Sequence, residues 1–329
     1  WFFHESVPVA WEASLRRCGG GFFHSPAGLR AGAPAGVPLF AQLRDADKVV
    51  GVAAGVRTNC RLSFRRRHAY FPTVPAFDES VRHPEAMRSL TVALQKKGLA
   101  DVRWDAFDAS WDPTPRGVAP TRLEYTLALD EDDATREARC DTNHRRHIRR
   151  GDRKGWTLTV VDPDVAMPLL TELLGVAAAR ATERGDGFEA IVPTLATERF
   201  IPGSPWGGTT FAARDGDTLL AAALVGWCNR RAYYIAGGAT AAGYEVSAPT
   251  WLHWRIAGRL ARDGMVVYNL GGTPAAAELL DHPAHGLYRF KDGFGATIHA
   301  SSGFDRPFDT GHLRRHDLLR RGAGLAAAV

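Results

Sequence analysis

The spacing of apolar and polar positions changes period several times along this chain. Over the first part, the pattern predicts a short amphipathic helix, a hairpin, a strand closed by prolines, a helix and one further strand. These elements fall, in order, at residues 4–20, 38–56, 61–71, 85–98 and 102–107. We expect the hairpin to turn at 44–48, because Asp45 and Asp47 are residue types that accept a tight turn.

The second part of the chain repeats this order. Strand 121–129 leads into residues 130–156, a polar helical stretch with no apolar stripe of its own. Beyond it, further strands and helices are predicted at 157–161, 166–185, 209–217, 218–227, 231–238, 248–264 and 265–272. We therefore expect an α/β (α+β) fold of two domains, each a mixed, mostly antiparallel sheet flanked by helices. The expected parts are a first domain at 1–140, a basic linking helix at 141–155 and a second domain at 156–329.

The composition agrees with two folded domains. The 329 residues exceed what one core usually supports, and 45% are hydrophobic and 23% charged. The four cysteines are far apart and form no pair with zinc-ligand spacing, so no metal is expected. No apolar run approaches the ~20 residues that span a bilayer, and the first residues carry an acid and a histidine where a signal peptide is basic. We expect a cytoplasmic protein without integral membrane association.

The net charge of +5 is unevenly distributed. Arginines gather at 65–67, at 145–154 and at 314–321. Such clusters suit a polyanionic partner, for example a phosphate-bearing substrate or tRNA. The competing interpretation of each cluster is a solvated strand or helix face.

Three segments carry a family resemblance, namely YYIAGGA at 233–239, MVVYNLGG at 265–272 and GLYRFKDGFG at 286–295. The order of elements resembles the acetyltransferase-like (GNAT) fold in tandem, and these segments resemble the FemABX family of tRNA-dependent aminoacyltransferases. Weaker similarity lies at 63–78 and 143–156. The chain has no long apolar heptad run, so it is similar to the compact members of the family that lack a helical arm.

The resemblance implies that Lys291 is an active-site residue. When an amine attacks an ester or thioester carbonyl, negative charge builds on the carbonyl oxygen. An ammonium held in a partly dry pocket between Phe290 and Phe294 would stabilise that charge, and we expect Gly293 and Gly295 to be flexible. Spacing alone would instead favour a solvent-facing lysine on an amphipathic turn.

The attacking amine must also lose a proton. Asp105, at the end of a predicted strand, is the acid that the resemblance offers as a catalytic residue, although Ala106 stands where the family commonly has proline. His282 and His285 are bases by type, and simple exposure is their alternative. The family also tends to have Asp where this chain has Asn269.

Residue chemistry and the resemblance together suggest binding residues. For substrate binding they are Arg65, Arg67, Tyr70, Tyr234, Asn269, Tyr288, Phe290 and Phe294. Arginine offers a planar fork for a diphosphate, but alternation along a strand lets at most two of residues 65–67 face one side. For the tRNA backbone they are Arg146, Arg149, Arg150 and Arg153.

The leading hypothesis is an aminoacyltransferase that moves an amino acid from aminoacyl-tRNA to an amine of a peptidoglycan precursor or natural-product intermediate. Aminoacyl-tRNA is a co-substrate, and no other cofactor is expected. The first alternative is an acyl-CoA-dependent N-acyltransferase. A CoA pyrophosphate loop usually presents a basic residue among its glycines, and residues 237–249 have the glycines without it. A non-catalytic nucleic-acid-binding protein is the second alternative, but it leaves GLYRFKDGFG unexplained.

Overall fold

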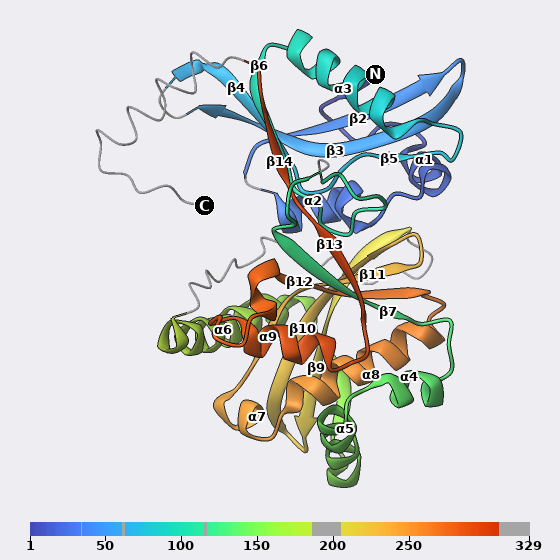
Figure 1. The fold of residues 1–329 in the computed structure, drawn as a ribbon. Coiled ribbons are helices and arrows are strands. Elements are labelled where there is room, and N and C mark those ends of the chain that lie inside the picture. Colours follow the sequence, from blue (N-terminus) through green and yellow to red (C-terminus); the bar gives the residue numbers. More distant parts are fainter. Residues whose placement is uncertain (34, 61–62, 115–116, 186–204, 309–329) are drawn as a thin grey trace. The chain divides into compact units, whose positions relative to one another are not determined.

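A computed structural model describes the chain except for residues 34, 61–62, 115–116, 186–204 and 309–329, and the side chains of 60–66 and 184 are also outside the description. The arginine cluster at 314–321 therefore lies outside the described residues. The chain divides into two compact units (Figure 1). The first combines 1–20, 33–113 and 303–329, and the second combines 21–32 and 114–302.

The first unit is a mixed sheet with helices α1 (Trp11–Cys18) and α3 (His83–Lys96) packed on it. Its strand order is β1-β2-β3-β4-β6-β14, with β5 paired to β3. The strands are β1 (Phe2–His4), β2 (Val37–Asp45), β3 (Lys48–Cys60), β4 (Ser63–Phe71), β5 (Ala76–Phe77), β6 (Leu99–Trp104) and β14 (Phe304–Pro307). Strands β2 and β3 form the expected hairpin, whose turn includes Ala46 at a φ of 49°.

In the first unit, the parallel strands β4 and β6 remain paired up to their last residues. Phe71 stacks on Trp104 with ring centroids 3.9 Å apart and an interplanar angle of 17°. Beyond the strands, Asp105 N donates to Phe71 O at 2.8 Å and Phe107 N donates to Pro72 O at 3.1 Å. These bonds continue the pairing, so the backbone groups here are engaged with each other.

The second unit is a larger mixed sheet in the order β13-β7-β12-β11-β10-β9-β8. The strands are β7 (Arg122–Ala128), β8 (Thr157–Val160), β9 (Trp206–Asp215), β10 (Thr218–Cys228), β11 (Arg231–Ala239), β12 (Val267–Pro274) and β13 (Thr297–Ser301). The helices are η1 (Phe22–His24), α2 (Pro26–Gly32), α4 (Asp133–Arg139), α5 (Thr142–Lys154), α6 (Pro163–Arg184), α7 (Ala241–Glu245), α8 (Ala248–Arg262), η2 (Ala275–Glu278) and α9 (His285–Asp292). The one parallel pair in this sheet, within the described residues, is β11–β12.

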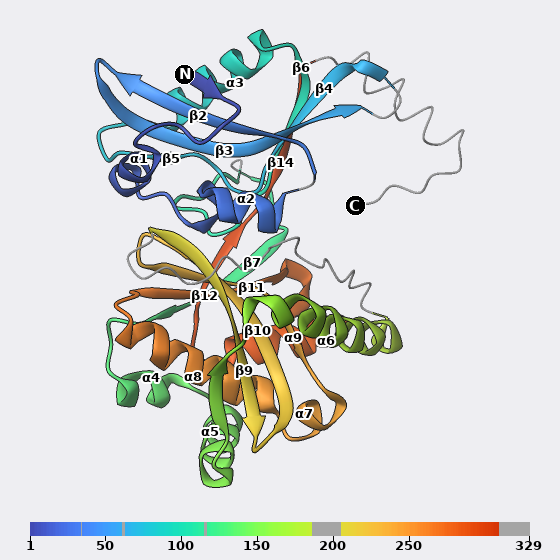
Figure 2. The ribbon, with the colours of Figure 1, turned by 180° about the vertical axis from the view of Figure 1, so that it is seen from behind.

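Helices α8 and α6 cover opposite faces of this sheet (Figure 2). Tyr234 of β11 contacts His253 of α8, with ring centroids 4.6 Å apart. On the other face, a Cβ at Gly238 would lie 2.6 Å from Leu173 O of α6. By length and composition, residues Pro163–Glu183 of α6 could also cross a membrane. Leu173 is buried, while 28% of the 18-residue apolar window of this helix is buried in all.

The boundaries of the two units differ from those expected at 140 and 155. Strand β7 lies between β12 and β13 and pairs with both, so residues 114–155 belong to the second unit. Residues 21–32 also join that unit. A linear division of the sequence cannot show this, because the pairing partners of β7 lie more than a hundred residues further on.

The polar helical stretch expected at 130–156, without an apolar stripe of its own, nevertheless buries one face of α5. Helix α5 buries His144, Ile148 and Gly151 on one face. A Cβ at Gly151 would collide with the ring of Trp251 on α8. One isoleucine and one glycine are sufficient here because Trp251 supplies the large apolar surface from the other helix.

Candidate active site

The pair β11–β12 separates after a short stretch of parallel pairing. The last matched residues are Tyr233 and Asn269. Directly beyond them β12 shifts register against β7, between Asn269 and Gly272. Gly271 has a φ of 73° within this irregularity, and its N–H donates to Asn269 Oδ1 at 2.8 Å. Bulges of this kind redirect backbone groups, and this one presents the Gly272 carbonyl to helix α9.

Lys291 extends from α9 to this opening. It is 5% exposed, and its Nζ donates to Gly272 O at 2.9 Å. Burial, followed by the charge of Arg122, lowers the pKa of Lys291 to about 7, although Glu124 acts in the opposite direction. The alternative of a solvent-facing lysine is therefore wrong. The amine is present in both protonation states near neutral pH.

A buried carboxylate connects the strands beside Lys291. Glu124 Oε1 accepts from Arg122 Nη2 at 3.2 Å and from Tyr233 Oη at 3.0 Å, and Oε2 accepts from Asn269 Nδ2 at 3.0 Å. Burial lowers the pKa of Arg122, but Tyr233 and Glu124 outweigh it and hold the pKa above its ordinary value. The guanidinium stays charged. It fits against Gly272, where any Cβ would collide with it.

His253 of α8 is close enough to Lys291 for the charge of the lysine to affect it. Burial, followed by the charge of Lys291, lowers the pKa of His253 to about 3. Its Nδ1 lies 2.8 Å from Tyr268 Oη, and burial raises the pKa of that tyrosine well above its ordinary value. A neutral imidazole and a neutral phenol thus share one hydrogen bond, so His253 does not carry a proton charge at neutral pH.

The structure gathers most of the predicted second-unit residues around Lys291. Asn269 is 1% exposed within the Glu124 network. Tyr288 lies on α9 with its ring centroid 6.1 Å from that of Tyr125, and Phe290 lies 5.8 Å from His253. Phe294 is fully packed in the core cluster. Tyr234 packs on His253, and burial raises its pKa.

The predicted first-unit residues form a separate group. Tyr70 Oη donates to Asp105 Oδ2 at 2.6 Å, and Arg103 Nε lies 3.6 Å from Asp105 Oδ1. Arg67 is exposed on β4. Arg65 lies on the same strand, but its side chain is outside the described residues. Asp105 is therefore part of a hydrogen-bonded pair at the end of β6, and its catalytic role stays a prediction.

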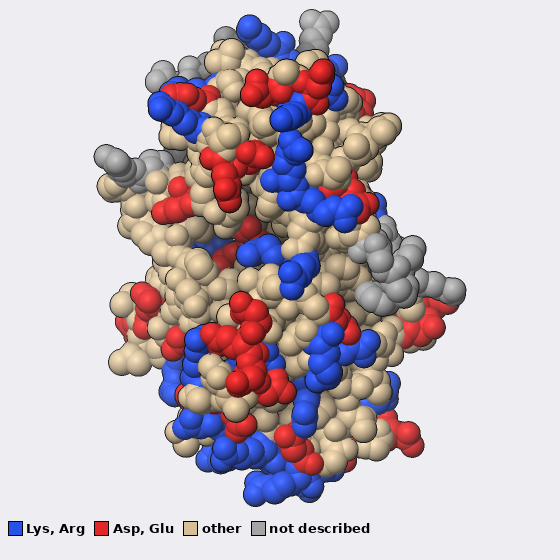
Figure 3. Space-filling model, turned by 90° about the vertical axis from the view of Figure 1, so that its right-hand side faces the viewer, with Lys and Arg blue, Asp and Glu red and all other residues tan. Residues whose placement is uncertain are grey.

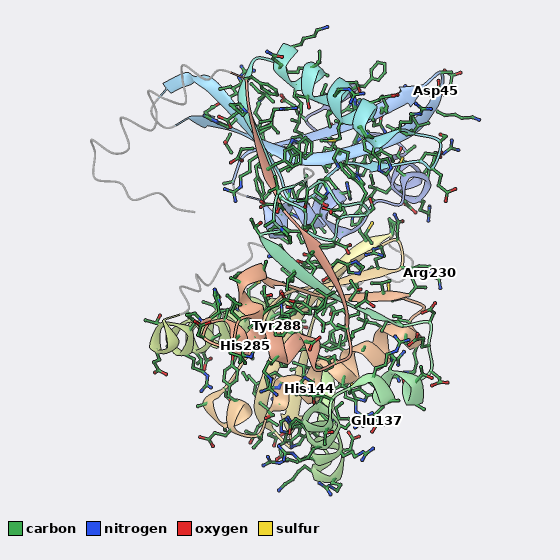
Figure 4. All side chains as sticks on the ribbon, in the orientation of Figure 1. Asp45, Glu137, His144, Arg230, His285 and Tyr288 are labelled. Atoms are coloured by element: carbon green, nitrogen blue, oxygen red, sulfur yellow. The ribbon has the colours of Figure 1, made fainter. Side chains whose placement is uncertain are left out.

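The two loop histidines support the start of α9. His285 Nδ1 lies 3.0 Å from Ala277 O, and its ring stacks on Tyr288 with centroids 5.8 Å apart. His282 Nδ1 accepts from Ala284 N at 3.1 Å. Figure 4 shows His285 and Tyr288 together on α9, with His144 at the end of α5 nearest to them. These contacts are sufficient to account for His282 as part of the loop and for His285 as the first residue of α9.

Four residues of the site were not among the predicted ones: Arg122, Glu124, Tyr233 and His253. A signal existed for two of them, because Arg122 and Glu124 are two apart on a strand and so share one face, while Leu123 and Tyr125 share the other. The buried histidine has no such signal within its Trp-rich helix. Among the described residues, no group of three His, Cys, Asp or Glu side chains is arranged to hold a metal ion.

Residues 138–292 match the acetyltransferase (GNAT) domain family. The described residues of this region have the GNAT-type fold. The region contains α5, strands β8 to β12 and helix α9 with Lys291. No curated protein sequence matches the chain at a significant level.

Solved structures share the fold over nearly the whole chain. The crystal structure of FemX has a TM-score of 0.69 at 12% identity, over 96% of this chain and 99% of that chain. L-PGS from Bacillus licheniformis has a TM-score of 0.52 at 12% identity, over 95% and 96%. The C-terminal domain of a putative lysylphosphatidylglycerol synthetase from Agrobacterium fabrum has a TM-score of 0.51 at 14% identity, over 94% and 96%. At these identities the similarity establishes the fold, and the expected tandem GNAT-like α/β architecture is confirmed.

Proposed function

We propose that the protein moves an amino acid from aminoacyl-tRNA to an amine and forms an amide bond, with Lys291 stabilising the charge that develops. The observation that carries this proposal is the buried Nζ of Lys291 at the point where β11 and β12 separate, inside a GNAT-type domain. A lysine is rarely buried unless it is paired or used.

The chemistry requires a donor of hydrogen bonds at the reacting carbonyl. The amine nitrogen forms a bond to the ester carbon, the carbonyl oxygen becomes an oxyanion, and the bond to the ribose oxygen then breaks. A base takes the proton from the amine and passes it to that ribose oxygen as the oxygen leaves. An ammonium has three N–H donors, and among the described residues Lys291 uses one of them, on Gly272 O. The remaining donors can serve substrate oxygens, and an approaching anion favours the charged form of the lysine.

The proposed acceptor is an amine of a peptidoglycan precursor or of a natural-product intermediate. If the acceptor carries a diphosphate, the exposed guanidinium of Arg67 offers planar donors for it. The role of Arg65 stays a prediction. Tyr70 and Asp105 lie at the end of the same parallel pair, and we retain Asp105 as the candidate proton acceptor.

The proposed site for the tRNA backbone is a cationic stripe on α5, formed by Arg146, Arg149, Arg150 and Arg153. All four are exposed, and the helical period places them opposite the buried face of α5. Arg149 pairs with Glu137 at 2.9 Å, whereas the other three have no ion pair among the described residues. Figure 3 shows Lys and Arg side chains gathered at the lower end of the molecule, where α5 lies in Figure 1. Such a stripe attracts a phosphate backbone without reading sequence.

Acyl-CoA is the competing donor, and the name of the matched domain family favours it. Its pyrophosphate would need the loop after β11, where glycines commonly leave room for phosphate oxygens. Here a Cβ at Gly243 would collide with Leu220 O, and Gly238 packs against α6. Thr240 caps α7 by accepting from Gly243 N at 3.0 Å. These glycines serve close packing, which supports tRNA over CoA as the donor.

The deciding experiment supplies the protein with bulk charged tRNA or with acetyl-CoA, each labelled in its acyl group. The acceptors are a panel of amines that includes a nucleotide-linked muramoyl pentapeptide. Transfer from aminoacyl-tRNA is expected, and label moving from acetyl-CoA alone would contradict the proposed donor. We expect Lys291→Met to lower transfer about 100-fold or more, whereas the exposed Lys48→Met should leave it unchanged.

A further inference from the structure

The last turn of α9 carries Lys291, and its final carbonyls form hydrogen bonds with a different part of the chain. A helix leaves its final carbonyls without partners inside the helix. In α9, Phe290 O is 2.9 Å from His144 Nε2, and Gly293 O accepts from Asp141 N at 2.9 Å. The carbonyls between them accept from the amides of the following residues. Two of the bonds that end this helix therefore come from the start of α5.

His144 is itself fixed at this position. It is 6% exposed, and its Nδ1 lies 3.0 Å from Asp141 Oδ1. The same carboxylate caps α5 by accepting from His144 N at 2.6 Å. The imidazole packs edge-on to Phe294, with centroids 4.6 Å apart and an interplanar angle of 77°. Both ring nitrogens of His144 thus face oxygen acceptors, one on each helix.

The glycines of the lysine motif fit closely around this histidine. A Cβ at Gly293 would collide with the His144 ring. Gly295 has a φ of 69°, and a Cβ there would lie 2.5 Å from Arg139 Cβ. The expectation that these glycines provide flexibility is wrong, because they permit close packing of residues 293–295 on residues 139–144.

We propose that His144, held by Asp141, is a positioning residue that keeps Lys291 at the Gly272 carbonyl. This inference rests on the proposed role of Lys291, but not on the identity of the acyl donor. Lys291 lies directly after Phe290 and two residues before Gly293, the two carbonyl positions that the start of α5 holds. Freeing this turn would move Nζ, and a displacement of about 1 Å can lower a rate about 100-fold.

Two substitutions of His144 test separately the hydrogen-bond contacts of its two ring nitrogens. The amide nitrogen of Gln falls near Nε2 of histidine, so His144→Gln keeps donation to Phe290 O. The amide nitrogen of Asn falls near Nδ1, so His144→Asn keeps the contact with Asp141 and loses the contact with α9. His299→Gln, on the exposed edge strand β13, is the control. All variants are compared for kcat and KM with the active donor, for thermal midpoint, and for the pKa of Lys291 by lysine-selective NMR.

We expect His144→Gln to retain kcat within about threefold, and His144→Asn and His144→Ala to lose about 10-fold to 100-fold in kcat with little change in KM. The pKa of Lys291 should rise in the latter two, because a loosened turn admits water. Unchanged kcat and an unchanged Lys291 pKa in His144→Asn would overturn the inference, even if the thermal midpoint fell. If His144→Ala does not fold, the Gln and Asn pair decides. If no donor supports transfer, the proposed function fails, while the pKa of Lys291 still tests the positioning role.

Discussion

Asn269 donates a hydrogen bond from Nδ2 to Oε2 of Glu124 at 3.0 Å, across the neighbouring strands β12 and β7. This contact, together with the one to Gly271 N, fits an amide rather than a carboxylate at position 269. An aspartate would place a second carboxylate against Glu124, and two carboxylates in one buried site repel each other. The amide instead supplies a donor to the carboxylate and an acceptor to Gly271 N.

Asn269→Asp should therefore destabilise the protein in a pH-dependent way. We expect the free energy of unfolding to fall by about 2–3 kcal/mol at pH 8, and by less at pH 5, where one carboxyl can hold a proton. Urea unfolding at the two pH values measures this. Asn143→Asp, on the exposed side of α5, is the charge-matched control. An equal loss at both pH values would show that geometry, rather than charge, is responsible.

Lys291→Met should stabilise the folded protein while it removes transfer activity. The pKa of Lys291 is about 7 in the folded state and 10.5 ordinarily, so the folded protein binds fewer protons than the unfolded chain between these values. Stability of the wild type accordingly rises with pH across this window. The gain from Lys291→Met should amount to a few kcal/mol at pH 6, at about 1.4 kcal/mol per pKa unit, and shrink towards pH 10. Denaturant unfolding measures this gain in unfolding free energy. A gain that grew with pH would contradict the burial of Lys291.

The cationic stripe on α5 should control binding of tRNA but not the chemical step. Arg150→Glu is expected to raise the KM or Kd for aminoacyl-tRNA about 10-fold, to leave kcat unchanged and to reduce the salt slope of binding by about one. Arg214→Glu carries the same charge change at the half-buried end of β9, and should have little effect. Equal responses of the two variants would indicate that net charge, rather than α5, attracts the RNA.

Two glycines of the α9 region should respond oppositely to alanine. Gly293→Ala would force a methyl group into the His144 ring, and we expect a loss of about 1–3 kcal/mol in unfolding free energy together with reduced transfer. Gly286, in the same helix, has open space where its Cβ would lie, so Gly286→Ala should be neutral or stabilise by up to about 1 kcal/mol. The two variants are compared by their thermal unfolding and by their initial rates of transfer. Full activity in Gly293→Ala would show that the close fit at His144 is dispensable.

The elements were predictable where periodicity is local. The hairpin β2–β3, helix α8 and the strand leading to Asn269 follow from spacing and turn residues alone. The burial of α5 was not predictable, because its apolar partner is Trp251 on another helix. The role of Lys291 came from resemblance, whereas its environment of Arg122, Glu124 and His253 depends on strand pairings between distant segments.

The interleaving of the two units constrains how the protein can be divided. The chain passes from one unit to the other at 20/21, 32/33, 113/114 and 302/303. No single cut in the sequence therefore yields an intact half, and a fragment that starts at Trp156 would lack the strand that carries Glu124. Expressing either unit alone would require joining segments that lie far apart in the sequence.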